Sequence, residues 1–96
     1  MPEVYPMQSP RTAWRVYDGE AVILWPDDST LNTLNSVGTL IWESADGKSP
    51  LSAIVARICE EFDVDPERAE RDAIAFIGKL GARGLLTVSE TIQHAP

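Results

Sequence analysis

The chain contains one cysteine and one histidine, and this scarcity excludes several classes of chemistry. Cys59 alone cannot form an internal disulfide or a cysteine-cluster metal site, and its presence suits a reducing compartment. It flanks an apolar stripe on a predicted helix, which favours a packed thiol over a reactive one. His94 lies in a polar C-terminal tail, with no second ligand or nucleophile nearby in the sequence. We therefore expect neither enzyme activity nor a bound metal or cofactor.

Long hydrophobic runs are missing as well. No apolar segment approaches the ~20 residues that a membrane-spanning helix needs. The first residues, Met1 to Pro6, have neither the basic end nor the apolar stretch of a signal peptide. The sequence therefore predicts a cytoplasmic location and no membrane partner.

Basic residues are outnumbered: 8 Lys and Arg against 15 Asp and Glu give a net charge of −7. Affinity for nucleic acid depends on cationic side chains that neutralise phosphates, so this balance disfavours DNA or RNA as a partner. The candidate recognition helix, residues 66–83, carries acids beside bases, and their charges cancel. A small winged-helix DNA-binding transcriptional regulator is thus the alternative function rather than the expected one.

What the chain does have is enough apolar residues for a single core. Its 96 residues are 44% hydrophobic, which suits one modest globular domain and is too little for two. Pro2, Pro6 and Pro10 predict that residues 1–12 form an extended arm rather than a regular element. The domain is expected over residues 13–88, followed by a polar tail over residues 89–96.

Three short strands are predicted at the start of the domain. Residues 13–18 alternate between the two faces, and residues 20–25 are apolar on both, as expected of a central strand. Asp18-Gly19 between them is typical of a tight hairpin turn. Residues 30–34 supply the third strand, which simple hairpin connections place at the edge of a three-stranded antiparallel meander.

Each of the three helices that follow has its own start signal. Asn35 is a good N-cap for the first, Ser49 precedes a proline suited to the first position of the second, and Asp65 does the same for the third. The third helix runs to about residue 83, and residues 85–88 add a short extended piece. The predicted fold class is α+β, a winged-helix-turn-helix-like domain with a three-stranded antiparallel sheet followed by three helices.

Helical spacing also marks the buried faces. Val37, Leu40 and Ile41 share one face of the first helix, where Gly38 is expected to let a neighbouring backbone approach closely. On the third helix, the residues predicted to face the core are Ala69, Ala73, Phe76, Ile77 and Leu80.

The third strand lacks protection against edge-to-edge pairing. Residues 30–34 contain none of the lysines or prolines that usually blunt an exposed edge. Two interpretations follow. Either the N-terminal arm or the 85–88 piece covers this edge, or a partner peptide adds a strand to it through main-chain hydrogen bonds.

The order of these motifs resembles the PqqD-like family, the peptide-recognition domains of pathways that modify ribosomally made peptides. The resemblance spans about Trp14 to Leu86, and the ordered set of motifs is more specific than any single one. It is carried by Asp18-Gly19-Glu20-Ala21-Val22, Leu34-Asn35-Ser36-Val37-Gly38, Ile41-Trp42-Glu43, Asp46-Gly47-Lys48, the run from Ile54 to Phe62 with Asp63-Val64-Asp65-Pro66-Glu67, and then Asp72, Phe76, Leu80 and Gly84-Leu85-Leu86.

The resemblance implies a non-catalytic adaptor that binds the leader segment of a precursor peptide as an added β-strand. Such a protein presents the leader to a modifying enzyme, which is a radical S-adenosylmethionine (SAM) enzyme, a cyclase or a lasso-peptide leader protease. Monomer and homodimer both fit. The implied peptide-binding residues lie on the third strand and the third helix: Leu31, Asn32, Thr33, Leu34, Asp72, Ala75, Phe76 and Lys79. A competing stripe of the same helix consists of Arg71, Ile74 and Gly78, and periodicity does not choose between the two.

Overall fold

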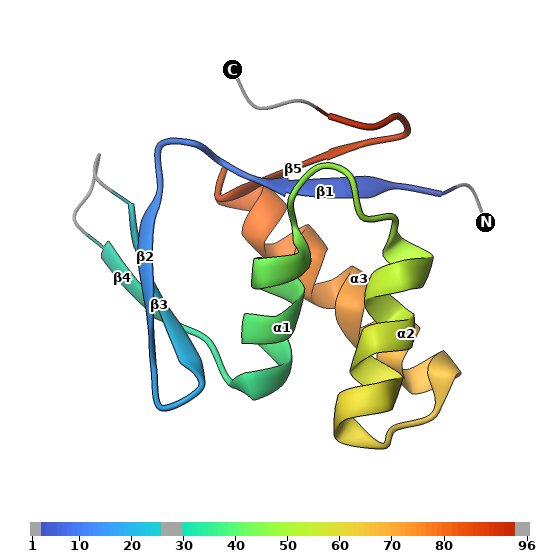
Figure 1. Cartoon of the computed structure of the whole chain (residues 1–96). Helices are drawn as coiled ribbons and strands as arrows, with labels where there is room; N and C mark the ends of the chain where they lie inside the picture. The colour runs from blue at the N-terminus through green and yellow to red at the C-terminus, as the bar shows by residue number, and fades with distance from the viewer. Residues whose placement is uncertain (1–2, 26–29, 94–96) are drawn as a thin grey trace.

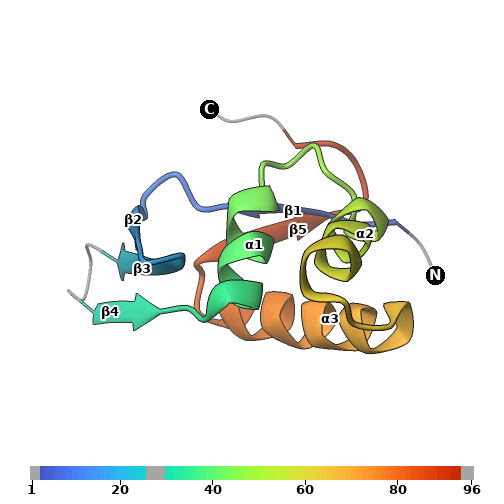
Figure 2. The ribbon, with the colours of Figure 1, turned by 60° about the horizontal axis from the view of Figure 1, so that its bottom comes forward.

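A computed structural model of the chain describes residues 3–25 and 30–93, so the expectations for Pro2 and His94 lie outside the described residues. A sheet of three strands stands beside the helices, and a ribbon of two further strands crosses one end of the helical layer (Figures 1 and 2). No helix in the described part of the chain is long and apolar enough to cross a membrane.

The elements follow the predicted order, with one additional strand at the start. The strands are β1 (Tyr5–Gln8), β2 (Ala13–Tyr17), β3 (Glu20–Trp25), β4 (Thr30–Thr33) and β5 (Leu86–Ser89). The helices are α1 (Ser36–Ser44), α2 (Leu51–Phe62) and α3 (Pro66–Ala82). The three-stranded antiparallel sheet followed by three helices confirms the predicted fold class.

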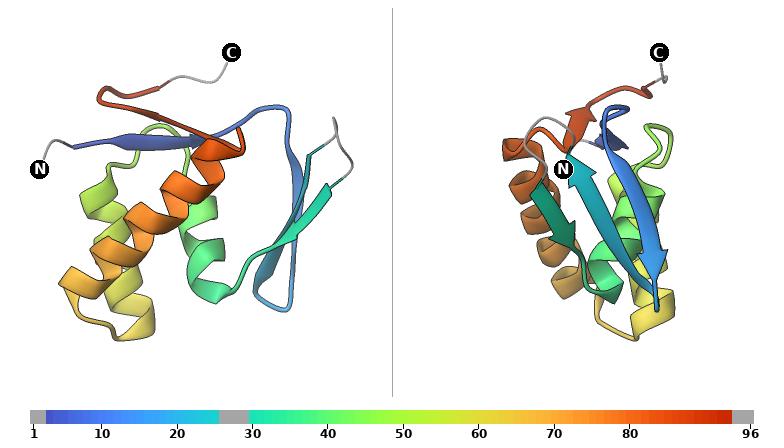
Figure 3. Two further views of the ribbon diagram at one scale, coloured as in Figure 1. Left: turned by 180° about the vertical axis from the view of Figure 1, so that it is seen from behind. Right: turned by 90° about the vertical axis from the view of Figure 1, so that its left-hand side faces the viewer.

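The strands β2, β3 and β4 form the predicted meander. Asp18 and Gly19 both have positive φ, 52° and 80°, so the hairpin turn has the twist of its flanking strands. Farther along the sheet, the register pairs Leu24 of β3 with Leu31 of β4. The strand order leaves β4 at one edge, and this is the strand of the sheet nearest to α3 (Figure 3, right).

The prediction of an irregular N-terminal arm is wrong for Tyr5–Gln8. This segment is a strand, β1, which pairs antiparallel with β5 and places Pro6 opposite Val88. The two-stranded ribbon tolerates the missing donor of Pro6. The Pro6 carbonyl in turn accepts a hydrogen bond from the N–H of Gly47 at 2.9 Å, which fastens β1 to the connection between α1 and α2.

The pairing of β1 with β5 excludes one of the two interpretations of the third strand. These two strands form a separate sheet, and neither is a neighbour of β4. Figure 2 shows them side by side, running from behind α1 toward α2. Within the described residues, the expectation that the arm or the C-terminal piece covers the edge is therefore wrong.

Two of the three predicted helix caps are confirmed. Asn35 Oδ1 accepts a hydrogen bond from the N–H of Gly38 at 2.8 Å at the start of α1. Asp65 Oδ1 accepts one from the N–H of Arg68 at 3.0 Å at the start of α3. These side chains satisfy backbone donors that have no partner inside the helix.

The predicted cap of α2 is wrong. Pro50 rather than Ser49 holds the N-cap position, and the helix begins at Leu51. Ser49 instead belongs to the preceding turn, where its N–H donates a hydrogen bond to the Asp46 carboxylate at 2.8 Å. The N–H of Leu51 donates to the distant carbonyl of Val4 at 2.8 Å, so a tertiary contact replaces the local cap.

The Asp46 carboxylate organises the connection between α1 and α2. Its partial burial favours the neutral form, but hydrogen bonds from the N–H groups of Lys48 and Ser49 and from the Ser49 hydroxyl outweigh this effect. Together they hold the pKa of Asp46 below its ordinary value of 3.8. Asp46 also forms a β-bridge with Met7 of β1, so the charged turn supports the ribbon.

Trp42 lies at the centre of the core. It is fully buried, and Trp14 of β2 packs against it edge-to-face with ring centroids 6.1 Å apart. Phe76, on the predicted core face of α3, is only partly buried at the margin. The buried apolar residues come from the sheet, the helices, β5 and the positions next to them: Ala21, Ile23, Leu34, Ile41, Trp42, Ala45, Leu51, Ile54, Ile58, Ala69, Ala73, Ile77, Leu80, Leu85 and Leu86.

Replacing Trp42 by alanine should lower the free energy of unfolding by about 3 to 5 kcal/mol, because it leaves a large cavity in the core. Urea denaturation followed by circular dichroism measures the change. Ile92→Ala, at a half-exposed position, is the control and should cost less than about 0.5 kcal/mol. A loss below about 1 kcal/mol for Trp42→Ala would show that the core is centred elsewhere.

Lowering the pH should reduce the stability of the wild-type protein more steeply than that of the Asp46→Asn variant. Because the folded state lowers the pKa of Asp46, this carboxylate stabilises the protein above its unfolded pKa near 3.8. The contribution is lost as the pH falls through the folded pKa. Melting temperatures between about pH 6 and pH 3 measure the difference. Equal slopes for Asp46→Asn and wild type would contradict the role of Asp46.

Candidate functional site

A groove of about 260 Å³ lies between β4 and α3. Figure 3 shows the strand and the helix side by side, with β4 at the edge of the sheet. The end of the meander forms one wall and α3 the other. The residues that line the groove are Leu31, Asn32, Thr33, Leu34, Phe76, Lys79, Leu80 and Arg83.

The hydrogen bonds of the sheet determine which backbone groups of β4 are free. The N–H of Leu34 donates to the carbonyl of Ala21 at 2.8 Å, and in an antiparallel ladder every second residue bonds to the same neighbouring strand. Asn32 is therefore bonded to β3, whereas the N–H and C=O groups of Leu31 and Thr33 point toward the open edge. The side chains alternate in the same way, so Asn32 and Leu34 share the face that packs toward the helices.

The α3 wall is apolar at one end and cationic at the other. Phe76 is half-buried against the core, and Leu80 is buried in the floor of the groove. Lys79 and Arg83 are exposed and follow at helical spacing. Arg83 donates a hydrogen bond from Nη1 to Asn32 Oδ1, which links the end of α3 to β4. Within the described structure, Asn32 Nδ2 is buried without a hydrogen-bond partner.

Gly38 of α1 makes room for the Phe76 ring. A Cβ atom added at Gly38 would lie 2.8 Å from Phe76 Cε2, well inside the contact distance of two carbon atoms. The expectation that Gly38 admits a neighbouring backbone is thereby corrected, since an aromatic side chain approaches instead. The missing side chain in α1 therefore helps to set the position of the opposite groove wall.

Six of the eight predicted site residues lie around the groove. They are Leu31, Asn32, Thr33, Leu34, Phe76 and Lys79. Sequence reasoning missed Leu80 as a groove residue, and it missed Arg83 altogether. Both follow Phe76 at i+4 and i+7, and this spacing was the signal that could have found them. That these residues bind a peptide stays a prediction.

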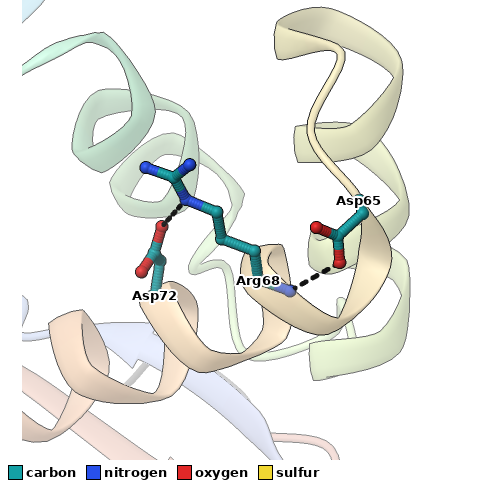
Figure 4. A network of polar contacts seen from close by, with 3 residues as sticks. All are labelled: Asp65, Arg68 and Asp72. Atoms are coloured by element: carbon teal, nitrogen blue, oxygen red, sulfur yellow. Dashed lines mark hydrogen bonds and ion pairs between the residues drawn. The ribbon is translucent and has the colours of Figure 1, made fainter.

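Asp72 and Ala75, the other two predicted site residues, do not line the groove. Both are exposed on α3. The Asp72 carboxylate forms an ion pair with the Arg68 guanidinium at 3.8 Å, while the backbone N–H of Arg68 donates to the capping residue Asp65 (Figure 4). A pair of exposed side chains contributes at most about 1 kcal/mol, so Asp72 can exchange Arg68 for another partner at little cost.

The competing stripe of α3 lies on a different side of the helix. Arg71 and Ile74 line a separate hollow of about 360 Å³ together with Glu67 and Glu70. Gly78 lines neither this hollow nor the groove, and an added Cβ there would meet open space. All the described residues around the hollow belong to α3, and none of them is part of a strand. The groove beside β4, in contrast, has a strand on one side and α3 on the other.

The groove presents binding groups rather than a reactive pair. Cys59 of α2 is partly buried against the core and does not line the groove. Within residues 3–25 and 30–93, no group of three His, Cys, Asp or Glu side chains is placed to hold a metal. Main-chain donors and acceptors beside apolar and cationic side chains suit the binding of an extended peptide.

Comparison with known proteins adds independent findings. The family model described as coenzyme PQQ synthesis protein D (PqqD) matches residues 20–86, which is most of the chain. No match was found among curated proteins. The solved structure of TbiB1 in complex with the TbiA(beta) leader peptide has a TM-score of 0.77 and 29% identity, covering 94% of this chain and 99% of that chain. Lasso peptide synthetase B1 complexed with the leader peptide shares the fold, with a TM-score of 0.74 and 24% identity over 86% and 98% of the two chains.

Two helical glycines allow a matched test of the contact with Phe76. Gly38→Ala should displace the ring and destabilise the protein by about 1 to 3 kcal/mol. Gly78→Ala, with open space around it, should stabilise α3 by about 0.5 to 1 kcal/mol. Chemical denaturation measures both changes, and the aromatic NMR signals of Phe76 should shift only in Gly38→Ala. Stability changes of the same sign would contradict the steric role of Gly38.

Proposed function

The chain belongs to the PqqD family, and from this premise we propose that it is a leader-peptide recognition protein. It binds the leader segment of a ribosomally made precursor peptide as an added β-strand and presents it to a modifying enzyme. One observation carries the proposal: β4 has an open edge in the described structure, and this edge borders a groove whose other wall is α3.

The open edge supplies affinity that does not depend on the peptide sequence. Leu31 and Thr33 each direct one N–H and one C=O away from β3. An extended peptide laid along β4 can satisfy these groups, and each main-chain hydrogen bond contributes about 0.5 to 1.5 kcal/mol net. The groove then receives alternate peptide side chains, which supplies the specificity of strand addition.

The proposed contacts divide between the two walls. The strand wall consists of Leu31 to Leu34, and the helix wall consists of Phe76, Lys79, Leu80 and Arg83. Asp72 and Ala75 are kept as proposed contacts for peptide residues that extend beyond the groove toward the start of α3.

An adaptor role fits the composition of this site. The groove lining holds amide, hydroxyl, cationic and apolar side chains, and none of them forms a nucleophile–base pair. TbiB1, with which the chain shares 29% identity over nearly the whole of both chains, was solved with a leader peptide bound, which supports the same class of ligand. We propose that the chemistry resides in the partner, a radical SAM enzyme, a cyclase or a leader protease.

Replacing Thr33 by proline should weaken leader binding at least about tenfold. The proline removes the edge-facing N–H and puts its ring in the path of the incoming strand. Pairing with β3 should survive because this N–H points away from β3. The measurement is fluorescence anisotropy of a labelled synthetic leader, taken from a precursor peptide encoded beside this gene.

Thr33→Val is the matched control, since it changes the side chain and keeps the N–H; it should bind the leader nearly as well as wild type. Leu31→Pro repeats the test at the other open position of the edge. Circular dichroism verifies that each variant is folded. Tight leader binding by folded Thr33→Pro and Leu31→Pro would exclude strand addition to β4.

A further inference from the structure

The charge of the groove is opposite to that of the chain. The chain carries a net charge of −7, yet the charged residues among those described that line the groove are Lys79 and Arg83. Their position near the end of α3 suits the helix dipole, but the dipole does not require a cationic side chain to turn toward β4. Arg83 does turn that way, because its guanidinium reaches Asn32.

The exposed Arg83 guanidinium offers hydrogen-bond donors to a ligand beside Asn32. Asn32 Oδ1 already accepts from Arg83, while Asn32 Nδ2 is buried without a partner in the described structure. The guanidinium has five N–H donors, and its bond to Asn32 uses one of them. Several N–H donors beside positive charge match a carboxylate, which accepts two or more hydrogen bonds and strengthens each by its charge. This end of the groove therefore favours an acidic side chain.

The other end of the groove is apolar. Leu34 and Leu80 are almost completely buried, and the half-buried Phe76 ring lies against Gly38. No charged side chain of the described residues lines this end. An apolar side chain placed here would remove the exposed part of the Phe76 ring from water.

A strand added to β4 presents its side chains to these two ends at a fixed spacing. Residues directly opposite each other on neighbouring strands point to the same face of the sheet. The peptide residues opposite Asn32 and Leu34 therefore both point toward the groove. They are separated by one residue, which lies opposite Thr33 and points to the outer face.

Resting on the proposed function, we propose that the groove recognises peptides in which an acidic and an apolar residue are separated by one position. The acidic residue lies opposite Asn32 and binds Arg83, with Lys79 adding positive charge. The apolar residue lies opposite Leu34 and packs on Phe76. A peptide antiparallel to β4 carries the apolar residue first, and a parallel peptide carries the acidic residue first, so the order of the two reports the direction of the added strand.

Selection from a displayed library of random peptides tests this pattern without knowledge of the natural precursor. The 96-residue chain should enrich peptides with Asp or Glu two positions from an aromatic or aliphatic residue. Replacing that acid by its amide in a selected peptide should weaken binding about tenfold, as expected when a charge-assisted contact is lost. Arg83→Glu should enrich Lys or Arg at the same position and keep the apolar residue.

Arg71→Glu is the matched control. It makes the same change of charge at an exposed residue of the same helix, but in the separate hollow. This variant should keep the wild-type preference for acids. Arg83→Gln is a second variant in case charge reversal disturbs the end of α3, and it should lose the preference for acids without gaining one for bases.

The outcomes separate this pattern from the proposed function. If selected peptides lose binding to Thr33→Pro but show no preference for acids, strand addition stands and the pattern is wrong. The same conclusion follows if Arg83→Glu and Arg83→Gln keep the preference for acids. If no peptide is enriched, or if Thr33→Pro binds the selected peptides as tightly as wild type, both the pattern and the proposed function fail.

Discussion

The groove depends on the way in which Ala21 is held between the end of β4 and the start of α1. Its carbonyl accepts a hydrogen bond from the N–H of Leu34 at 2.8 Å, and its N–H donates to Thr39 Oγ1 at 2.7 Å. Ala21 is completely buried, so water does not compete for either bond. The backbone of Ala21 thus fixes both the position at which β4 ends and the position of α1 relative to the sheet. Because Gly38 of α1 receives the Phe76 ring, the same constraint extends to the opposite wall.

An open strand edge is a liability for a folded domain, because it can pair with other chains, and within the described residues this edge stays open. The strands that could cover β4 pair with each other, so their hydrogen bonds are already used. Protection comes from two other features: β4 is only four residues long, and Arg83 places a charged group beside it through Asn32. Short strands and charges discourage a second copy from pairing there. Both features leave the backbone groups of Leu31 and Thr33 accessible to a peptide.

Features encoded by adjacent residues were predictable from the sequence, and features set by distant residues were not. The caps at Asn35 and Asp65 are local, and both are confirmed, as are the fold class and the membership of the PqqD family. The strand β1 was missed because its partner lies at the other end of the chain. Ser49 carried a valid cap signal, but Asp46 competed for it successfully. The contact of Arg83 with Asn32 likewise depends on how the end of α3 approaches β4, which periodicity does not specify.

An acidic protein that selects an acidic side chain is physically consistent, because the two effects act over different distances. The net charge of −7 acts on an approaching peptide from the whole surface, and physiological salt screens such interactions beyond about 8 Å. A carboxylate seated opposite Asn32 would instead meet the Arg83 guanidinium at hydrogen-bond distance, where screening is weak. Local contact therefore outweighs the overall repulsion once the peptide backbone is paired with β4. In the proposed mode of binding, the backbone of the edge strand brings the peptide into place, and the side chains at the end of α3 discriminate among the sequences that reach it.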